Sequence, residues 1–481
     1  MIHFDYNEST RKIQVTSEDL DLFEELRTYF SVKNEGADFA RRKLPKSRAR
    51  FVSDRLYMIK PTGYCLAGLY DEIRQWCIAR QITGITFSDS FQKYVDDGFD
   101  YEIYNNYQEY KLRDYQQTFL ERAIKFGRGV CVTGTGGGKT LMCASLIDSY
   151  YQACDKETFK CIVVVPNIGL VTQTYNDFND YGVTFTTTRW TGKQKPDFDV
   201  NVIIVNSAIL LRRFKEHGWI KDVDLVLVDE VHGLTNGNKI TDTVSKIKTT
   251  HKYGFTGTLP ENDHFRWNVI GAIGPVIFEK SSQELRDEGY LTNAQVRRIE
   301  ISYKTPIPVQ STNDYYDELD YIYSNEYRNN VIKNLCDKYE KNILILVNHI
   351  RHGEKLLEVL SQLDRPVFFI QGNVDVEDRI KVIELIEQTE GVICIAISKI
   401  FSTGINIKNL HMLIFGSGGK SFIRTVQSIG RGLRLHPSKT MFNIIDICDQ
   451  LYYGAEHAGK RLQFYDKEKI RHKTVTLEEN G

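Results

Sequence analysis

The chain has little of what marks membrane, secreted or metal-binding proteins. No apolar run is long enough to span a bilayer, and no charged-then-apolar secretory segment opens it. Its nine cysteines are scattered through apolar segments and form neither a CxxC pair nor a Cys/His spacing typical of metal sites. We therefore expect a soluble, cytoplasmic protein with reduced core thiols and no membrane contact.

The chain also has almost no net charge. A formal value of −1 gives no global electrostatic argument for a polyanionic partner, so any nucleic-acid surface must be local. One candidate is a basic run without an acidic residue, followed by Phe51 and Tyr57, and made of Arg41, Arg42, Lys43, Lys46, Arg48 and Arg50. Such a run suits phosphate neutralisation with base stacking, and it equally suits a solvated loop.

The length of 481 residues exceeds what one core usually holds and predicts about three compact units. Residues 1–105 have short, mixed elements and predict a small α+β accessory domain. One amphipathic helix there would be capped by Thr16 or Ser17, and a second covers residues 66–80. Residues 94–110 have the composition of a connector.

From residue 112 the pattern changes to short apolar runs that alternate with helical segments. Such runs are typical of strands buried on both faces of a parallel sheet. They cover residues 130–132, 162–165, 202–205 and 225–228, and then 343–347, 367–370, 392–397, 412–415 and 442–447. A proline-containing break separates the two sets, so we predict two tandem α/β domains at 106–305 and 306–481.

A glycine-rich loop lies between the first apolar run and a helix that begins near Leu141. It consists of Thr133, Gly134, Thr135, Gly136, Gly137, Gly138, Lys139 and Thr140. Glycines let backbone N–H groups turn around phosphate oxygens, so Lys139 would reach the β and γ phosphates of ATP and Thr140 would ligate Mg²⁺. Thr133 stands where the strict phosphate-loop pattern has glycine, and a plain glycine-rich turn is the alternative.

Two acidic residues open a DEVH sequence after the run at 225–228. Asp229 and Glu230 would emerge at the carboxyl end of a strand, where α/β proteins bind ligands. We predict that Asp229 holds Mg²⁺, that Glu230 orients and deprotonates the attacking water, and that His232 belongs to the same catalytic set. A solvated acidic turn is the alternative.

An arginine pair in the second predicted domain completes the catalytic pattern. Arg431 and Arg434 share one face if their segment is helical, and would act as arginine fingers on the transferring phosphoryl group. Two surface arginines on an amphipathic helix are the alternative, which the order of all three motifs disfavours.

The ordered motifs resemble those of superfamily 2 DExH helicases over residues 112–449. The resemblance implies RecA-like domains, adenine contacts from Arg113 and Gln116, and nucleic-acid backbone contacts from Pro166 and Gln173. It also implies that three residues, Thr256, Thr258 and Gln427, couple hydrolysis to strand movement, and that Gly404 approaches ATP or a phosphate. Asn406 departs from the family, since many relatives carry an acidic residue near that position.

Within the superfamily, residues 401–405 and 408–411 resemble the phage UvsW type of branch-migration helicase. That resemblance implies a monomer or weak oligomer that acts on forked or branched DNA in recombination or repair, in the host cytoplasm if phage-encoded. Three alternatives stay open: a duplex translocase without strand separation, an RNA helicase, and a nucleotide-gated binding protein. Glu230 disfavours the last, because a non-hydrolysing clamp has little use for a second carboxylate.

Overall fold

The computed structural model describes residues 1–96, 100–192, 196–234, 239–304, 314–371, 376–398, 407–417 and 436–479. The chain divides into two compact units. The first comprises Met1–Thr133 and Gly138–Lys280, and the second comprises Ser281–Gly481 and the short segment Gly134–Gly137. Among the described residues, no helix has both the length and the apolar character needed to cross a membrane.

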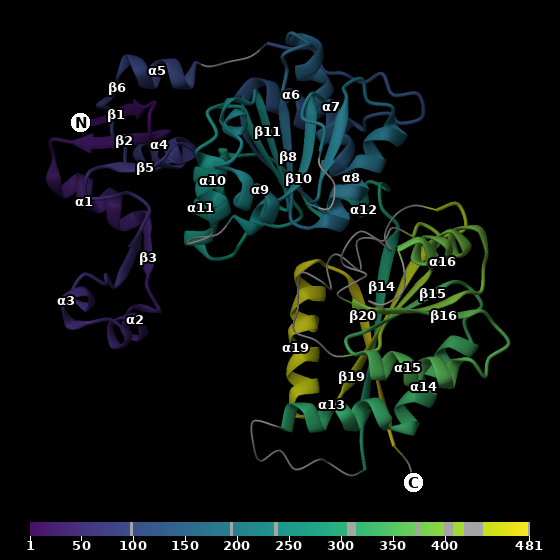
Figure 1. Ribbon diagram of the computed structural model, residues 1–481. Coiled ribbons are helices and arrows are strands. Elements are labelled where there is room, and N and C mark those ends of the chain that lie inside the picture. The colour runs from purple at the N-terminus through teal and green to yellow at the C-terminus, as the bar shows by residue number, and fades with distance from the viewer. Residues whose placement is uncertain are drawn as a thin grey trace. The chain divides into compact units, whose positions relative to one another are not determined.

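The first unit is built around a seven-stranded parallel sheet with strand order β13-β7-β12-β11-β8-β10-β9 (Figure 1). The strands are β7 (Gly129–Thr133), β8 (Cys161–Val165), β9 (Thr187–Trp190), β10 (Val202–Asn206), β11 (Leu225–Asp229), β12 (Lys252–Thr256) and β13 (Val276–Lys280). The four predicted apolar runs are confirmed as β7, β8, β10 and β11, which are buried along nearly their whole length. The prediction missed β9, β12 and β13, whose sequences mix polar and apolar residues.

Helices pack on both faces of this sheet: α6 (Asp114–Phe126), α7 (Lys139–Ala153), α8 (Ile168–Tyr181), α9 (Ser207–Arg213), α10 (Lys239–Ser245) and α11 (Asp263–Ile273). Helix α7 is buried from Leu141 to Tyr150, because the connector before α6 lies over it. Tyr107 donates to buried Asp148 at 2.7 Å, and Ser145 donates to the backbone of Tyr104 at 2.6 Å. These contacts fix the connector on the helix that carries the phosphate loop.

The amino-terminal module contains a four-stranded sheet, β5-β2-β1-β6, and a separate β3-β4 hairpin. Its strands are β1 (Ile2–Asn7), β2 (Lys12–Ser17), β3 (Ser31–Lys33), β4 (Arg55–Tyr57), β5 (Tyr64–Leu66) and β6 (Ile85–Phe87). Its helices are α1 (Leu20–Tyr29), α2 (Ala37–Lys43), α3 (Lys46–Ala49), α4 (Tyr70–Ala79) and α5 (Asp89–Val95). Helices α2 and α3 follow β3 at the end of the module remote from β1 (Figure 1).

The cap predicted for the first helix is wrong. Thr16 and Ser17 end strand β2, and Asp19 caps α1 by accepting from the N–H of Leu22 at 3.0 Å. A carboxylate there also faces the positive end of the helix dipole, which favours Asp over the hydroxyl residues before it.

The module shares its hydrophobic core with the sheet domain beside it. Trp267 and Ile270 of α11 belong to the same buried cluster as Phe4, Phe30 and Trp76. The approach is so close that a Cβ at Gly68 would lie 2.2 Å from the carbonyl oxygen of Ile270. Module and sheet domain are therefore one packed body.

The second unit holds another seven-stranded parallel sheet, ordered β16-β17-β15-β18-β19-β14-β20. Its strands are β14 (Asn293–Ser302), β15 (Ile343–Val347), β16 (Val367–Ile370), β17 (Ile393–Ile397), β18 (Met412–Phe415), β19 (Met441–Asp449) and β20 (Arg471–Glu478). All five predicted runs are confirmed. Strand β14 pairs with β19 and β20, so the boundary predicted at 305/306 is wrong and lies before β14.

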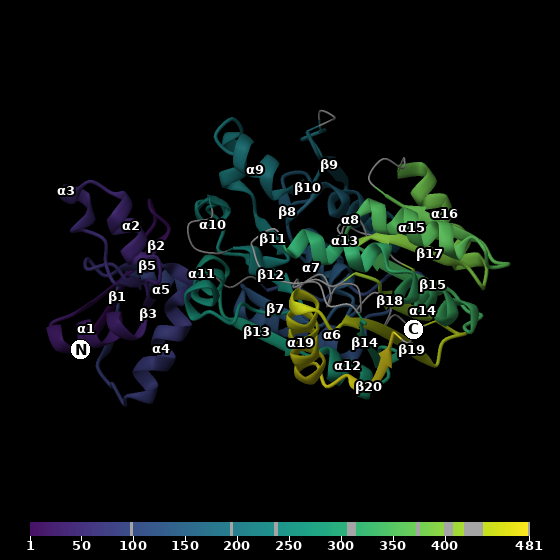
Figure 2. The ribbon, with the colours of Figure 1, turned by 90° about the horizontal axis from the view of Figure 1, so that it is seen from below.

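Helices of the second unit are α12 (Ser282–Asp287), α13 (Asp314–Ser324), α14 (Glu326–Asp337), α15 (Ile350–Leu360), α16 (Val376–Gln388) and α19 (Tyr452–Lys467). Helix α15 lies beside β17 (Figure 2) and also contacts β16, and α19 packs against β19. Two α/β parallel-sheet domains with a small α+β module before them confirm the predicted fold class.

A buried ion pair joins α14 to this sheet. The guanidinium of Arg328 is 0% exposed and donates to both carboxylate oxygens of Asp449, at 2.7 and 3.1 Å, and to the carbonyl of Gly416. We expect Arg328→Met to lower the free energy of unfolding by about 3–5 kcal/mol, because it leaves the buried Asp449 carboxylate uncompensated.

The matched control is Arg351→Met in the same unit, whose partner Asp320 lies at 3.5 Å with both side chains exposed. Arg351→Met should lower the free energy of unfolding by no more than about 1 kcal/mol. Urea unfolding measures both, and equal losses would contradict the role assigned to the buried pair.

Candidate active site

The phosphate loop joins β7 to α7 at the carboxyl edge of the first sheet. Gly136 and Gly138 have positive φ values of 88° and 75°, which glycine adopts at least cost. A Cβ at Gly138 would also lie 2.3 Å from the amide nitrogen of Gln116. Turn geometry and close packing therefore both require glycine here, while Thr133, the departure from the strict pattern, is simply the buried last residue of β7.

Lys139 and Thr140 form the first turn of α7, directly after the loop. The Nζ of Lys139 donates to the carbonyl oxygen of Thr133 at 3.0 Å, which holds the ammonium over the loop. The 15-residue helix directs its positive dipole end to the same place. Backbone N–H groups, an ammonium and a hydroxyl fit the triphosphate of ATP with a bound Mg²⁺.

The predicted adenine-contacting residues lie beside this loop. The Oε1 of Gln116 accepts from the backbone N–H of Arg113 at 2.9 Å and caps α6, while its Nε2 lies 3.5 Å from the carbonyl of Gly138. Gln116 is only 2% exposed in this arrangement. The start of α6 is thereby fixed against the loop.

The acidic pair stands at the carboxyl end of β11, two strands from β7. Asp229 ends the strand, and Glu230 has a φ of 50°, a left-handed conformation that is uncommon outside glycine. The turn brings the backbone N–H of Glu230 to 2.9 Å from the Asp229 carboxylate. Burial and the neighbouring Glu230 charge raise the pKa of Asp229, and Lys139 opposes that rise.

Two adjacent carboxylates of this kind favour a bound cation. Among protein cofactors Mg²⁺ fits best, because it takes oxygen ligands and is usually held by one or two carboxylates together with substrate phosphates. Asp229 and Thr140 are the side chains that would supply those ligands. When bound, Mg²⁺ would neutralise charge on the phosphates.

A hydrogen-bonded chain links the DEVH box to the end of β12. The Nδ1 of His232 lies 2.9 Å from the hydroxyl of Thr256 and 3.2 Å from the carboxylate of Glu230. The Thr256 hydroxyl donates to the carbonyl of Thr258 at 2.8 Å, so it accepts from His232 and the Nδ1 carries the proton. The structure thus brings together residues that the sequence predicted from two separate motifs.

Two further predicted residues lie at the neighbouring strand. Pro166 is exposed at the end of β8, and Gln173 lies on α8, where its amide oxygen has no hydrogen-bond partner among the described residues. The sequence analysis missed two helix caps at this end of the sheet: Asn167, two residues after β8, caps α8, and Asn206, the last residue of β10, caps α9. An asparagine between an apolar run and a helix was the available signal.

The remaining predicted site residues fall outside the described residues. These are the arginine pair Arg431 and Arg434, the coupling residue Gln427, and Gly404. Their roles stay predictions.

A parallel sheet with a phosphate loop and an acidic pair at its carboxyl edge defines a nucleotide-hydrolysing motor domain. A family model described as "Type III restriction enzyme, res subunit" matches residues 109–261, which contain both motifs. A second, described as "Helicase conserved C-terminal domain", matches residues 326–436. The two domains are RecA-like, and the chain belongs to the superfamily 2 helicases, as an ATP-dependent helicase.

Individual relatives agree with this assignment. The ATP-dependent DNA helicase uvsW of Enterobacteria phage T4 is 26% identical over 95% of this chain and 96% of its own length. The DNA 3'-5' helicase XPB of Mycobacterium tuberculosis is 23% identical over 77% of this chain and 66% of its own. The fold resembles that of the DNA-bound restriction-modification enzyme LlaBIII, with a TM-score of 0.58 and 16% identity over 83% of this chain and 34% of that enzyme.

The hydroxyl of Thr256 offers a test of coupling between hydrolysis and movement. Thr256→Val keeps the side-chain shape and removes the link between His232 and Thr258. We expect ATP hydrolysis to persist and the number of base pairs separated per ATP to fall about fivefold or more, the lower end of typical coupling energies. Parallel measurements of phosphate release and strand separation give this ratio.

Thr118→Val is the matched control, because its hydroxyl donates only to the exposed backbone of α6. Lys139→Ala should lose hydrolysis and unwinding together. An unchanged ratio in Thr256→Val would rule out the coupling role.

Proposed function

We propose that this helicase acts on DNA and prefers branched structures, such as forks, Holliday junctions and displacement loops. The observation that carries the proposal is the likeness to the phage T4 DNA helicase uvsW, which spans 95% of this chain and therefore includes the amino-terminal module. Because the module shares a core with the first motor domain, DNA held on the module stays in a fixed relation to that domain.

In the proposed hydrolysis step, a water oxygen bonds to the γ-phosphorus and the bond to the β–γ bridging oxygen breaks. Glu230 orients the water and accepts its proton, while Lys139 contacts the β and γ phosphates. We assign Arg431 and Arg434 to the charge that develops on the phosphoryl group. The chain from Glu230 through His232 to Thr256 would report loss of the γ-phosphate to the strand-contacting segments.

The basic run of the module carries the proposed branch-point contact. Arg41 has partners within the module, since its guanidinium forms ion pairs with Asp38 and Asp54 at 3.4 and 2.7 Å. Arg42 and Lys43 are exposed on the last turn of α2. The contact surface of this run therefore begins at Arg42.

Exposed aromatic rings accompany these cations. Phe39 is 62% exposed and lies 4.4 Å from the Lys43 ammonium, and Phe51 is 76% exposed and lies 4.8 Å from the Arg50 guanidinium. Cations that neutralise phosphates beside rings on which bases stack are typical of single-strand contacts.

A groove of about 540 Å³ between the module and α10 is also lined by basic and aromatic residues. Its charged lining residues are Lys12, Arg55, Lys60 and Lys239 against the single acid Asp242, and Tyr57 and Tyr64 add aromatic surface. We propose that one DNA arm lies here, with backbone contacts that give shape preference without sequence specificity.

A second candidate function is duplex translocation without strand separation. The match of residues 109–261 to a restriction-enzyme motor family favours it. Displacement of a third strand from a triplex, beside separation of a forked duplex, distinguishes the two. Triplex displacement without fork unwinding would support translocation alone.

The module's role is tested by the double variant Arg42→Ala/Lys43→Ala. We expect weaker binding to a four-way junction and a salt dependence of log Kd reduced by about 2, because each lost phosphate contact contributes about 0.9. ATP hydrolysis without DNA should not change. Titrations of a labelled junction at several salt concentrations measure the slope.

The control variant is Lys333→Ala/Lys355→Ala, which removes two lysines from α14 and α15 of the second unit. An identical salt slope in both double variants would count against the module as the junction contact.

A further inference from the structure

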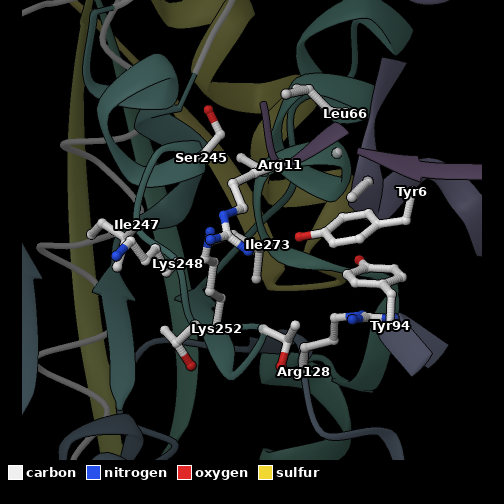
Figure 3. Close-up of a pocket in the computed structure, with 16 residues that line it drawn as sticks. Tyr6, Arg11, Leu66, Tyr94, Arg128, Ser245, Ile247, Lys248, Lys252 and Ile273 are labelled. Carbon is white, nitrogen blue, oxygen red and sulfur yellow. The ribbon is translucent and has the colours of Figure 1, made fainter. Parts of the chain in front are cut away.

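A small cavity lies where the amino-terminal module meets the first sheet domain. Its volume is about 30 Å³, and residues from both parts line it, including Tyr6, Arg11 and Tyr94 from the module and Arg128, Lys248 and Lys252 from the sheet domain. Arg11 extends into it from the turn between β1 and β2, towards Lys252, and the Tyr6 hydroxyl points the same way (Figure 3).

The cavity lies away from the ATP site. Arg128 directly precedes β7, and Lys252 is the first residue of β12, so both mark the amino ends of these parallel strands. The phosphate loop and the DEVH box follow the carboxyl ends of β7 and β11. The cavity and the ATP site therefore lie at opposite ends of the strands of one sheet.

Three cations converge on the cavity without a matching anion. Among the residues that the structure describes, none forms an ion pair with Arg11, Arg128 or Lys252. The ring of Tyr94 lies 4.0 Å from the Arg128 guanidinium, and the Asp71 charge acts on Arg128 without a salt bridge.

Lys252 is the most constrained of the three. It is only 8% exposed, and its ammonium donates to the carbonyl of Val244 at 3.0 Å. Burial, followed by the charges of Arg11 and Arg128, lowers the pKa of Lys252 to about 7. Without an anion, the charges of Arg11 and Arg128 disfavour the protonated form of Lys252. An anion between the three groups would favour that form instead.

We propose that this cavity binds one phosphate group, which bridges Arg11 of the module to Arg128 and Lys252 of the sheet domain. Guanidinium groups recognise phosphate oxygens by paired N–H donors, and the Tyr6 hydroxyl supplies a further donor. The volume exceeds the roughly 10–15 Å³ that a single water needs on the same scale, and it matches one small anion rather than a whole nucleotide.

The phosphate group has two sources, the DNA backbone and free phosphate in solution. Leu66 and Ser245 line both this cavity and the larger basic groove, so a strand in the groove passes next to the site. The bound group would tie the β1-β2 turn to the motor domain. This inference holds whether or not the helicase prefers branched DNA.

The test is thermal unfolding of the full chain in inorganic phosphate and in chloride at equal ionic strength. We expect a saturable rise of the unfolding midpoint with phosphate, because a ligand that binds only the folded state stabilises it. Arg11→Gln should lose the rise and keep the fold, since glutamine retains the apolar stem and has a similar backbone cost at the φ of 56°. Lys246→Gln, an exposed lysine paired with Asp242, should retain it.

Two further measurements identify where the phosphate binds and whether it comes from DNA or from solution. Lys139→Ala should retain the rise, which separates this site from the phosphate loop. If the DNA backbone is the source, Arg11→Gln weakens DNA binding more than Lys246→Gln does and lowers the salt slope by about 0.9. If free phosphate is the source, the two variants bind DNA alike.

The proposal is overturned if Arg11→Gln matches Lys246→Gln both in its response to phosphate and in its affinity for DNA. It is supported if the two variants differ in either measurement.

Discussion

The repulsion between Asp229 and Glu230 at the carboxyl edge of the first sheet is the constraint on which the site depends. Parallel pairing of β11 with β12 and β8 fixes where these carboxylates emerge. Lys139 alone cannot compensate both, because its ammonium also serves the loop backbone. A divalent cation with a polyphosphate resolves the conflict, so the arrangement favours the substrate whose hydrolysis drives the motor.

The DEVH box also contacts a neighbouring strand at this end of the sheet. The left-handed turn at Glu230 directs its carboxylate to His232, and His232 reaches the end of the next strand through Thr256. We propose that a change at the γ-phosphate acts on this neighbouring strand end through the contacts of His232 with Glu230 and Thr256. The module, packed on α11 of the same unit, follows any movement of this domain as a rigid attachment.

The sequence predicted the elements whose signal is local. Strands such as β8 and β15 are buried on both faces and are uninterrupted apolar runs, and the phosphate loop and DEVH box are contiguous motifs. The prediction missed β14 and β20, because exposed and polar residues interrupt their apolar pattern, and the missed β14 accordingly shifted the domain boundary. A cap is decided by one or two residues, so a prediction of Thr16 or Ser17 could miss the actual cap, Asp19.

Contacts between distant segments could not be predicted from the sequence. The bond from His232 to Thr256 depends on strand order, and Arg41 pairs with Asp54, which directly precedes β4. The cluster of Arg11, Arg128 and Lys252 joins three segments with no common motif. Pairing of such residues is set by tertiary packing, which no single-sequence pattern records.

The decisive experiment is ATP turnover measured with single-stranded, duplex, forked and four-way DNA and with RNA. We expect DNA to stimulate turnover, forked and four-way DNA to stimulate it more than linear duplex, and RNA to stimulate it least. Equal stimulation by RNA, or none by any DNA, would contradict a helicase that moves on branched DNA.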